Sequence, residues 1–229
     1  MLGIHNNMPA GTLYIVATPI GNLGDLTARA REILCAVPMV CCEDTRVTKK
    51  LLSHIESAAH TLRLDEHATA KTMHEIRSLL EKGSDVAVVS DAGTPGVSDP
   101  GAAVVAYVSA HLPEVSIVAI PGPSALAAAL SVAGFAFDRV VFAGFLPVKK
   151  GRQTRIAELA QERGCIVLYE SVHRIKKTLT ELESAMGDRR VVVCRELTKQ
   201  FETVYRGTIA QVLPQIVEKG EFVLVLAPQ

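Results

Sequence analysis

The chain has 229 residues, enough for one large domain or two small ones with a substantial hydrophobic core. Hydrophobic residues make up 48% and charged residues 21% of the sequence, which excludes an extended, disordered protein. The formal net charge is zero, so any contact with nucleic acid has to come from a local basic patch. Because no apolar run approaches the roughly 20 residues that cross a bilayer, no membrane segment is expected.

The N-terminus and the cysteines indicate the compartment. Residues 1–10 lack a basic region followed by an apolar stretch, which predicts a short disordered leader and not a signal peptide. The five cysteines are odd in number and contain no CxxC pair, and four lie in or beside apolar runs. We therefore expect small core residues in a reducing compartment, the cytoplasm. The histidines show no metal-ligand spacing, so no metal is expected: His5, His54, His60, His67, His74 and His111.

The first half of the chain alternates short apolar runs with amphipathic helical patterns. Strands are predicted at 13–17, 38–42, near Leu62, 86–89 and 115–120. Helices are predicted through Leu26, Ala30, Ile33 and Leu34, through Val47, Leu51 and Leu52, through Met73, Ile76, Leu79 and Leu80, and over 102–111. Single helices between successive strands are typical of parallel pairing through right-handed crossovers.

The pattern changes after Pro121-Gly122-Pro123. Helices are predicted at 124–133, near Ile156, through Leu179, Leu182 and Met186, and near Val212. Strands are predicted at 140–143, 166–169, 191–194, 202–206 and 222–227, and the last two favour antiparallel pairing. The sequence thus predicts two α/β domains, residues 11–122 with a mostly parallel sheet and residues 123–229 with a mixed sheet.

Three loops after predicted strands are rich in glycine and proline: residues 18–25, 90–101 and 121–125. Ligands collect at the carboxyl ends of strands in open α/β sheets, and glycine lets the backbone approach a ligand closely. Ordinary turns explain the first and third loops taken alone. The second loop, SDAGTPGVSDPG, exceeds the about 2–6 residues of a connecting turn and lacks dinucleotide and P-loop spacing. It indicates a nucleotide bound without a pyrophosphate cradle.

Several motifs occur in a specific order: TPIGNLGDLT, EDTR, SDAGTPGVSDPG, PGPSA, GFLP, YESVHR and RELTK. Their spacing over about residues 11–227 resembles the ribosomal RNA small subunit methyltransferase I family, a branch of the tetrapyrrole methylases. The resemblance implies a homodimer with S-adenosyl-L-methionine folded in the cleft between two α/β domains. It also implies the residues that hold the cofactor: Pro19, Asp91, Ala92, Gly93, Thr94, Val97, Ser98, Ser124, Ala125, Tyr169, Glu170 and Leu197.

Two departures bear on the substrate. Porphyrinoid methylases of this fold usually carry a GxGPGD-like first loop and a GDP-type second loop, whereas this chain has TPIGNLGD and GTP. The difference favours the RNA branch. Members of that branch often continue into a small C-terminal domain, but this sequence ends at Gln229, so we expect RNA contacts from such a domain to be absent or replaced.

Basic residues outside the cofactor loops are candidates for RNA contact. Arg46 lies in the EDTR segment, where Asp44 or Thr45 is expected to cap the following helix. A basic run after GFLP is usually a solvated surface, but cations at a helix N-terminus oppose the helix dipole, which favours phosphate contact. The predicted RNA-binding set is Arg46, Lys149, Lys150, Arg152, Arg155, His173, Arg174 and Lys199.

The implied reaction is transfer of a methyl group to a ribose 2′-hydroxyl of a cytidine in 16S ribosomal RNA. The enzyme has to align donor and acceptor and remove the proton of the hydroxyl. Four carboxylates are candidates, and the sequence does not choose among them: Glu43, Asp91, Glu170 and Glu196.

Two other functions fit the same residues. One is methylation of a tetrapyrrole or another small molecule on the same fold, and the other is a non-catalytic, cofactor-binding module associated with RNA. Neutral net charge and a small aromatic complement, four tyrosines and six phenylalanines, keep both alternatives open.

Overall fold

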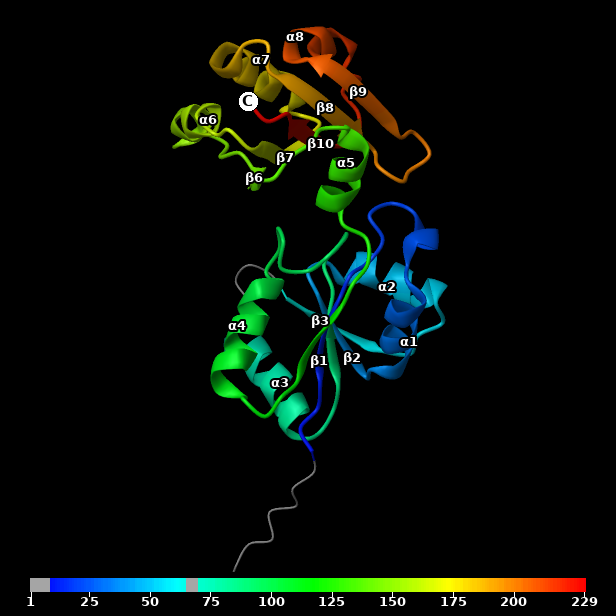
Figure 1. Ribbon diagram of the computed structural model, residues 1–229. Coiled ribbons are helices and arrows are strands. Elements are labelled where there is room, and N and C mark those ends of the chain that lie inside the picture. Colours follow the sequence, from blue (N-terminus) through cyan, green and yellow to red (C-terminus); the bar gives the residue numbers. More distant parts are fainter. Residues whose placement is uncertain (1–8, 65–69) are drawn as a thin grey trace, which may run out of the picture. The chain divides into compact units, whose positions relative to one another are not determined.

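The computed structural model describes residues 9–64 and 70–229. Most of the predicted leader, together with His5 and His67, lies outside these residues. The chain divides into two compact units, Met1–Ser124 and Ala125–Gln229, and each unit is built around its own five-stranded sheet (Figure 1). The prediction of two α/β domains is therefore confirmed.

The sheet of the first unit is entirely parallel, with strand order β3-β2-β4-β1-β5. Its strands are β1 (Leu13–Val16), β2 (Met39–Cys42), β3 (His60–Arg63), β4 (Val86–Val88) and β5 (Ile117–Ile120). All five coincide with predicted strands. Because every strand runs in the same direction, the loops at their carboxyl ends emerge at one edge of the sheet.

Helices cover both faces of this sheet. On one face α1 (Ala28–Ala36) and α2 (Thr45–His54) pack against Val16, Val40 and Ala87. On the other face α3 (Ala70–Glu81) and α4 (Gly101–His111) pack against Leu13, Val86 and Val88. Successive strand residues point to opposite faces, so an apolar run such as β4 supplies both cores, which explains why it reads as continuously hydrophobic. A short 3₁₀ helix, η1 (Leu23–Asp25), precedes α1.

The sheet of the second unit is mixed, with strand order β6-β7-β10-β8-β9. Its strands are β6 (Val140–Phe145), β7 (Cys165–Ser171), β8 (Arg190–Arg195), β9 (Thr203–Thr208) and β10 (Glu221–Leu226). β6 and β7 are parallel, and the remaining neighbours are antiparallel. The predicted mixed sheet is confirmed.

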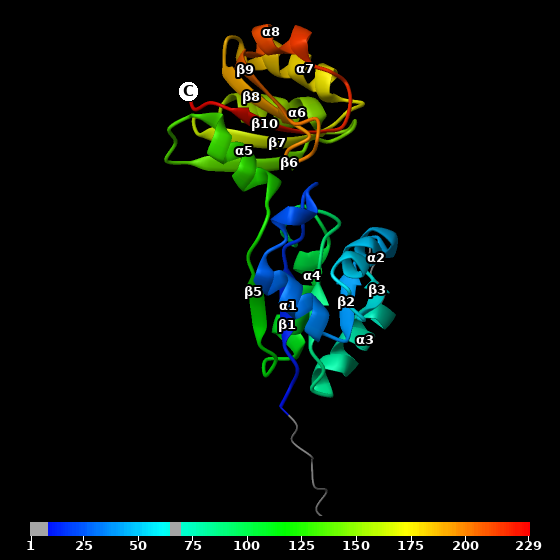
Figure 2. The same cartoon turned by 90° about the vertical axis from the view of Figure 1, so that its right-hand side faces the viewer.

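The two faces of this second sheet differ (Figure 2). Three helices, α6 (Arg152–Ala160), α7 (Ile175–Met186) and α8 (Ile209–Val212), pack with Ile166, Leu168 and Leu224 into one core. A 3₁₀ helix, η2 (Leu213–Gln215), follows α8, and α5 (Ala125–Ala133) packs against β10 on the other face. Because side chains alternate along β7, Tyr169 points toward the α5 face and Glu170 toward α7.

Four of the five cysteines are small core residues, as predicted, whereas Cys35 is exposed. Cys41, Cys42, Cys165 and Cys194 are buried, and none forms a disulfide. Burial raises the pKa of the Cys41 thiol to about 12 and that of Cys194 to about 11, so both stay protonated and unreactive near neutral pH. Among the described helices none is both long and apolar enough to cross a bilayer.

Candidate cofactor and substrate site

Three glycine- and proline-rich loops meet at one edge of the first unit's sheet. They follow β1, β4 and β5, and these strands are neighbours in the order β4-β1-β5. Residues more than 70 positions apart in the chain thereby become adjacent. The predicted loops lie side by side because of strand order, which the sequence pattern does not specify.

Hydrogen bonds join the three loops. The Thr18 amide donates to the Gly93 carbonyl at 2.9 Å, and the Gly93 amide donates to the Thr18 carbonyl at 3.1 Å. The Thr94 hydroxyl donates to the Pro123 carbonyl at 3.0 Å, which ties the loop after β4 to the loop after β5. A ligand that binds these loops therefore meets a surface that is already ordered, and binding loses little loop entropy.

Gly93 occupies a position that other residues fit poorly. Its φ is +87°, in the left-handed region, and a Cβ there would lie 3.2 Å from Ile20 Cγ2 and 3.6 Å from the Pro123 carbonyl oxygen. Both aspartates of the loop hold backbone amides. Asp99 accepts from Gly96 N and Gly101 N, each at 2.8 Å, ahead of α4. Asp91 accepts from Asp44 N at 3.0 Å.

The first-unit residues expected to hold the cofactor all lie on these loops. Asp91, Ala92, Val97 and Ser98 are exposed, whereas Gly93 is buried. The others are half-buried: Pro19, Thr94 and Ser124. Together these residues offer backbone groups, the Asp91 carboxylate and the apolar side chain of Val97. These groups suit a ligand that combines an amino acid with a nucleoside. No cluster of His, Cys, Asp and Glu able to hold a metal ion occurs in the described part of the chain.

A pocket of about 290 Å³ lies at the carboxyl ends of β2 and β3, lined by Glu43, Asp44, Thr45, Arg46 and Arg63. Asp44 caps α2 by accepting from Arg46 N at 2.8 Å, as one of the two predicted capping residues. The side chain of Arg46 is 87% exposed and pairs with Asp44 at 2.6 Å, which holds the pKa of that carboxyl well below its usual range. The pocket thus presents guanidinium groups beside carboxylates.

Arg63 lines the pocket but is not among the predicted site residues. It ends β3 directly opposite Cys42 in the parallel register with β2, which brings it beside the EDTR segment. Only the pairing of β3 with β2 places this arginine at the pocket.

Glu170 differs from the role predicted for it. Its side chain is fully buried and accepts from Ser171 N at 2.7 Å, from the Thr178 hydroxyl at 2.6 Å and from Arg174 Nε at 2.8 Å. With both oxygens bonded inside the second unit, Glu170 has no approach for a substrate hydroxyl. The carboxylate of Glu170 is therefore removed from the candidate proton acceptors, and the cofactor contact implied for this residue stays a prediction.

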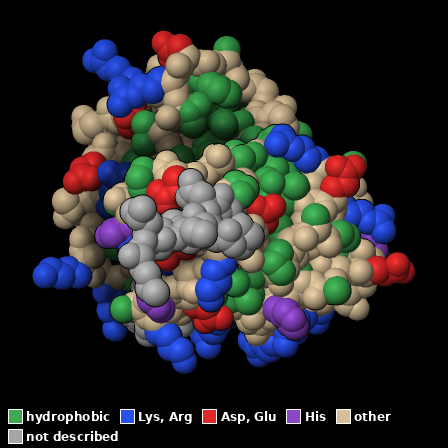
Figure 3. Space-filling view, turned by 90° about the horizontal axis from the view of Figure 1, so that it is seen from below, with side chains coloured by type: hydrophobic (Ala, Val, Ile, Leu, Met, Phe, Trp, Pro, Cys, Tyr) green, Lys and Arg blue, Asp and Glu red, His purple; other side chains and the backbone are tan. Residues whose placement is uncertain are grey.

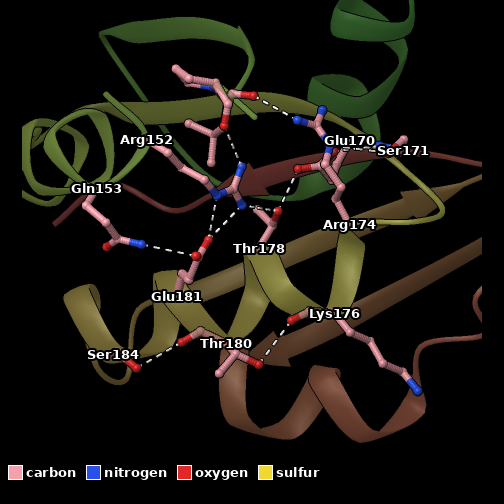
Figure 4. Close-up of polar contacts among 12 residues, drawn as sticks. Arg152, Gln153, Glu170, Ser171, Arg174, Lys176, Thr178, Thr180, Glu181 and Ser184 are labelled. Atoms are coloured by element: carbon pink, nitrogen blue, oxygen red, sulfur yellow. Dashed lines mark hydrogen bonds and ion pairs between the residues drawn. The ribbon is translucent and has the colours of Figure 1, made fainter. Parts of the chain in front are cut away.

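Arg152 also differs from the role predicted for it (Figure 4). The residue is 4% exposed, and its guanidinium pairs with Glu181 at 2.7 Å and donates to the Thr178 hydroxyl at 2.7 Å. A buried arginine that stabilises the packing of α6 on α7 is not available to an RNA phosphate. The sequence predicts RNA contact for Arg152 because it belongs to the basic run after GFLP, together with Lys149 and Lys150.

The other predicted RNA contacts fall into two groups. Lys149, Lys150 and His173 are exposed. The remaining cations have carboxylate partners: Arg155 pairs with Glu158 at 2.9 Å, Arg174 with Glu170 at 2.8 Å, and Lys199 with Glu221 at 2.8 Å. On the face shown in Figure 3, Lys and Arg side chains lie among Asp and Glu side chains, in keeping with the zero net charge.

Tyr169 and Leu197 are the remaining expected cofactor contacts, apart from Ala125, which begins α5. The Tyr169 hydroxyl accepts from Leu126 N at 3.1 Å, and burial raises its pKa. Glu196 and Thr198 have φ values of +54° and +65°, unusual for residues with a Cβ, and flank the buried Leu197. The Thr198 hydroxyl oxygen is buried and has no hydrogen-bond partner among residues 9–64 and 70–229. Strained backbone beside an unpaired polar atom is typical of a ligand contact.

Glu196 is a weak base. Burial opposes its ionisation, but hydrogen bonds from Lys199 and from Glu221 N hold the pKa of its carboxyl below the usual value. A carboxylate stabilised in this way removes a proton from a hydroxyl less readily than an unbonded one.

Comparison with known proteins gives the same fold and a family. Residues 12–213 match the family of Tetrapyrrole (Corrin/Porphyrin) Methylases. The chain is 47% identical to ribosomal RNA small subunit methyltransferase I of Xylella fastidiosa, covering 94% of this chain and 81% of the relative. It is 46% identical to the protein of that name from a Synechocystis species, covering 95% and 79%.

A solved structure shares the fold. The uroporphyrin-III C-methyl transferase of Thermus thermophilus, crystallised with S-adenyl homocysteine, is 18% identical and superimposes with a TM-score of 0.66, covering 95% of this chain and 97% of that one. The family match and the identities of 46% and 47% decide the relationship. The chain belongs to the ribosomal RNA small subunit methyltransferase I family, within the tetrapyrrole methylases.

Proposed function

We propose that this protein uses S-adenosyl-L-methionine to methylate the 2′-hydroxyl of a cytidine ribose in 16S ribosomal RNA, free or in the assembled small subunit. The observation that carries the proposal is the 47% identity to a relative named ribosomal RNA small subunit methyltransferase I, over 94% of this chain. The reaction takes place in the cytoplasm in this proposal. The loops after β1, β4 and β5 supply the cofactor site, and the pocket at Glu43 and Arg63 supplies acceptor contacts.

The loop residues fit S-adenosyl-L-methionine. In the first unit, Gly93 has no side chain at a position where a Cβ would crowd Ile20 Cγ2 at 3.2 Å. When bound, the cofactor supplies an electrophilic methyl group on a sulfonium. Asp91, Gly93, Thr94, Val97 and Ser98 would bind and orient it, with Tyr169 and Leu197 as further contacts implied by the family.

The acceptor hydroxyl has to lose its proton as its oxygen bonds to the methyl carbon. Two of the four candidate carboxylates are poor proton acceptors. The Glu170 carboxylate already accepts buried hydrogen bonds, and hydrogen bonds from neighbouring groups lower the pKa of Glu196. Glu43 and Asp91 remain, and the link between Asp44 N and Asp91 places both near the start of α2. In our proposal one of these two carboxylates accepts the proton, which contributes a rate factor of about 10²–10⁴.

Phosphate contacts come from exposed cations in this proposal. Lys149, Lys150 and His173 have the exposure that such contacts need, and Arg46 and Arg63 add guanidinium groups at the pocket. Four of the predicted cations would first have to leave a carboxylate partner, which weakens the case for them: Arg46, Arg155, Arg174 and Lys199. RNA affinity that depends on these contacts falls as salt rises.

The deciding experiment measures methyl incorporation from labelled S-adenosyl-L-methionine into small ribosomal subunits isolated from a strain that lacks the modification. We expect label at a single ribose 2′-oxygen, located by nuclease mapping. Label in a tetrapyrrole and none in RNA would replace this function with the small-molecule one. Cofactor binding without transfer to either substrate would indicate a non-catalytic module.

A homodimer belongs to the same proposal. Pairing two chains would double the basic surface available to a ribosomal substrate without changing the charge per chain. Light scattering at micromolar concentration should give a mass near twice the 24.5 kDa of one chain. A monomer that still methylates small subunits would remove the dimer from the proposal.

A further inference from the structure

Phe145 is a large apolar side chain that the structure leaves 52% exposed, at the end of the edge strand β6. Its direction results from an irregularity in the strand. The register between β6 and β7 shifts between Phe142 and Gly144, so that Phe142 lies opposite Val167 and Phe145 opposite Tyr169. Without the extra residue, side chains three positions apart would point to opposite faces. The bulge therefore turns both phenylalanines to the face that carries Tyr169.

Gly144 makes this bulge possible. Its φ is +58°, a left-handed conformation that glycine adopts without the steric cost borne by other residues. A bulge with a left-handed glycine re-aims the following side chain, and such features are over-represented at sheet edges and next to functional sites. The direction of Phe145 is thus built into the backbone.

The ring of Phe145 has a fixed support. Tyr169 meets Phe142 edge-on with ring centroids 4.9 Å apart and Phe145 edge-on at 5.8 Å. The Tyr169 hydroxyl is itself anchored by the amide of Leu126 at 3.1 Å. A half-exposed ring that is held in place binds a flat ligand without first losing much conformational entropy.

Two arginines, the half-buried Arg174 and the buried Arg152, hold the loop that follows Phe145 (Figure 4). Arg174 donates to the Leu146 carbonyl at 3.0 Å, and Arg152 donates to the Pro147 carbonyl at 3.2 Å. These arginines are in turn bonded to Glu170, Thr178 and Glu181, each at 2.7–2.8 Å. The loop is thereby tied to the core of the second unit, yet it carries the exposed Lys149 and Lys150.

A fixed, exposed aromatic ring followed by two exposed lysines matches the chemistry of single-stranded nucleic acid. Every base has a flat face that stacks on an aromatic ring, and the adjoining phosphates attract lysines. A surface for a second protein copy would not call for paired lysines next to the ring.

We propose that Phe145 stacks on one base of single-stranded RNA while Lys149 and Lys150 contact its phosphates, with Arg152 and Arg174 as positioning residues that hold the loop. The inference rests on the proposed RNA substrate and names where an unpaired strand binds the second unit. The bulge at Gly144, the contact of Phe145 with the Tyr169 ring and the hydrogen bonds from Arg152 and Arg174 then have one effect in common. Each of them fixes part of the segment Phe145–Lys150.

The test compares Phe145→Leu with Phe201→Leu. Phe201 is 65% exposed and lies between β8 and β9, at the opposite edge of the same sheet, so it is a matched control. The probes are an oligocytidylate of about 12 nucleotides and the same backbone without bases, which keeps the phosphates and removes the stacking.

We expect Phe145→Leu to weaken binding of the base-bearing RNA by about 5- to 100-fold and to leave binding of the abasic strand unchanged. Phe201→Leu should change neither. Equal loss on both probes, or no loss on either, would overturn the stacking. So would a fall in oligomer mass of Phe145→Leu with RNA affinity intact, which would assign the ring to an interface between copies.

The outcome is separable from that of the proposed function. If wild-type protein methylates small subunits and Phe145→Leu binds RNA normally, the stacking inference alone fails. If wild-type protein methylates no RNA while Phe145→Leu loses base-dependent affinity, the proposed reaction fails and the RNA-binding edge stands.

Discussion

The amide of Asp44 donates a 3.0 Å hydrogen bond to Oδ1 of Asp91, and this bond links the start of α2 to the loop after β4. The Asp91 carboxylate therefore has two properties that a mutation can separate. One is an oxygen atom that accepts a hydrogen bond from the Asp44 amide, and the other is its negative charge. Asp91→Asn keeps an acceptor oxygen and removes the charge, which makes it the informative variant.

We expect Asp91→Asn to retain its fold and, if Asp91 accepts the proton, to lose about 10²–10⁴ in the single-turnover rate of methyl transfer. Cofactor affinity from calorimetry should change much less than the rate. Glu43→Gln is the companion variant from the pocket, and the larger rate loss of the two identifies the acceptor. Unaltered rates in both would exclude carboxylate assistance by this pair.

Gly93→Ala should abolish or strongly weaken binding of S-adenosyl-L-methionine. The new methyl group would lie 3.2 Å from Ile20 Cγ2 in a residue with φ +87°. Gly134→Ala is the control, because Gly134 has φ +69° and no atom within 4 Å of the added carbon. Both variants bear a similar backbone cost of about 1 kcal/mol, so only Gly93→Ala should lose calorimetric binding. Equal affinity in the two variants would remove the loop from the cofactor site.

Lys149→Gln combined with Lys150→Gln should weaken RNA binding and lower the slope of log affinity against log salt by about 0.7 per lost contact. Cofactor affinity should not change. The matched control is Lys49→Gln with Lys50→Gln, another exposed pair of lysines, located on α2. If both double variants change the slope equally, general charge and not this loop controls the affinity.

Arg152→Met should act on stability. Removing the guanidinium leaves Glu181 and Thr178 without their buried donor, which costs about 3–5 kcal/mol. Urea unfolding would show this as a lower midpoint with an unchanged slope. Arg155→Met, which breaks only an exposed pair with Glu158, should cost less than about 1 kcal/mol. A small effect of Arg152→Met on unfolding, together with weaker RNA binding, would return Arg152 to the RNA-binding set.

Thr198→Val tests whether the Thr198 hydroxyl contacts the cofactor, because stability and cofactor affinity should then change in opposite directions. The valine keeps the shape and removes a buried hydroxyl oxygen that has no partner, so the unliganded protein should gain up to about 1 kcal/mol. If the hydroxyl bonds the cofactor, affinity should fall at the same time. Higher stability with unaltered affinity would leave this hydroxyl outside the site.

Much of the local structure follows from the sequence alone. Every predicted strand and helix is present within a few residues, because each apolar run has the period of the element that it forms, as in β4 or in α3 with its buried Ile76 and Leu80. The loop 90–101 is predicted to bind a ligand because its glycines and prolines exceed what a turn needs. These are properties of neighbours in the chain, and a linear pattern records them.

Only the tertiary structure decided which charged residues are exposed and which loops meet. Arg152 and Lys150 are two positions apart, yet Arg152 is 4% exposed and Lys150 is on the surface. The difference arises because α7 brings Glu181 and Thr178 to the guanidinium of Arg152. Arg63 joined the pocket through parallel pairing of β2 with β3, and Phe145 faces Tyr169 through a one-residue bulge. Such contacts depend on strand order and register, which arise from packing between distant segments and leave no periodic trace in the sequence.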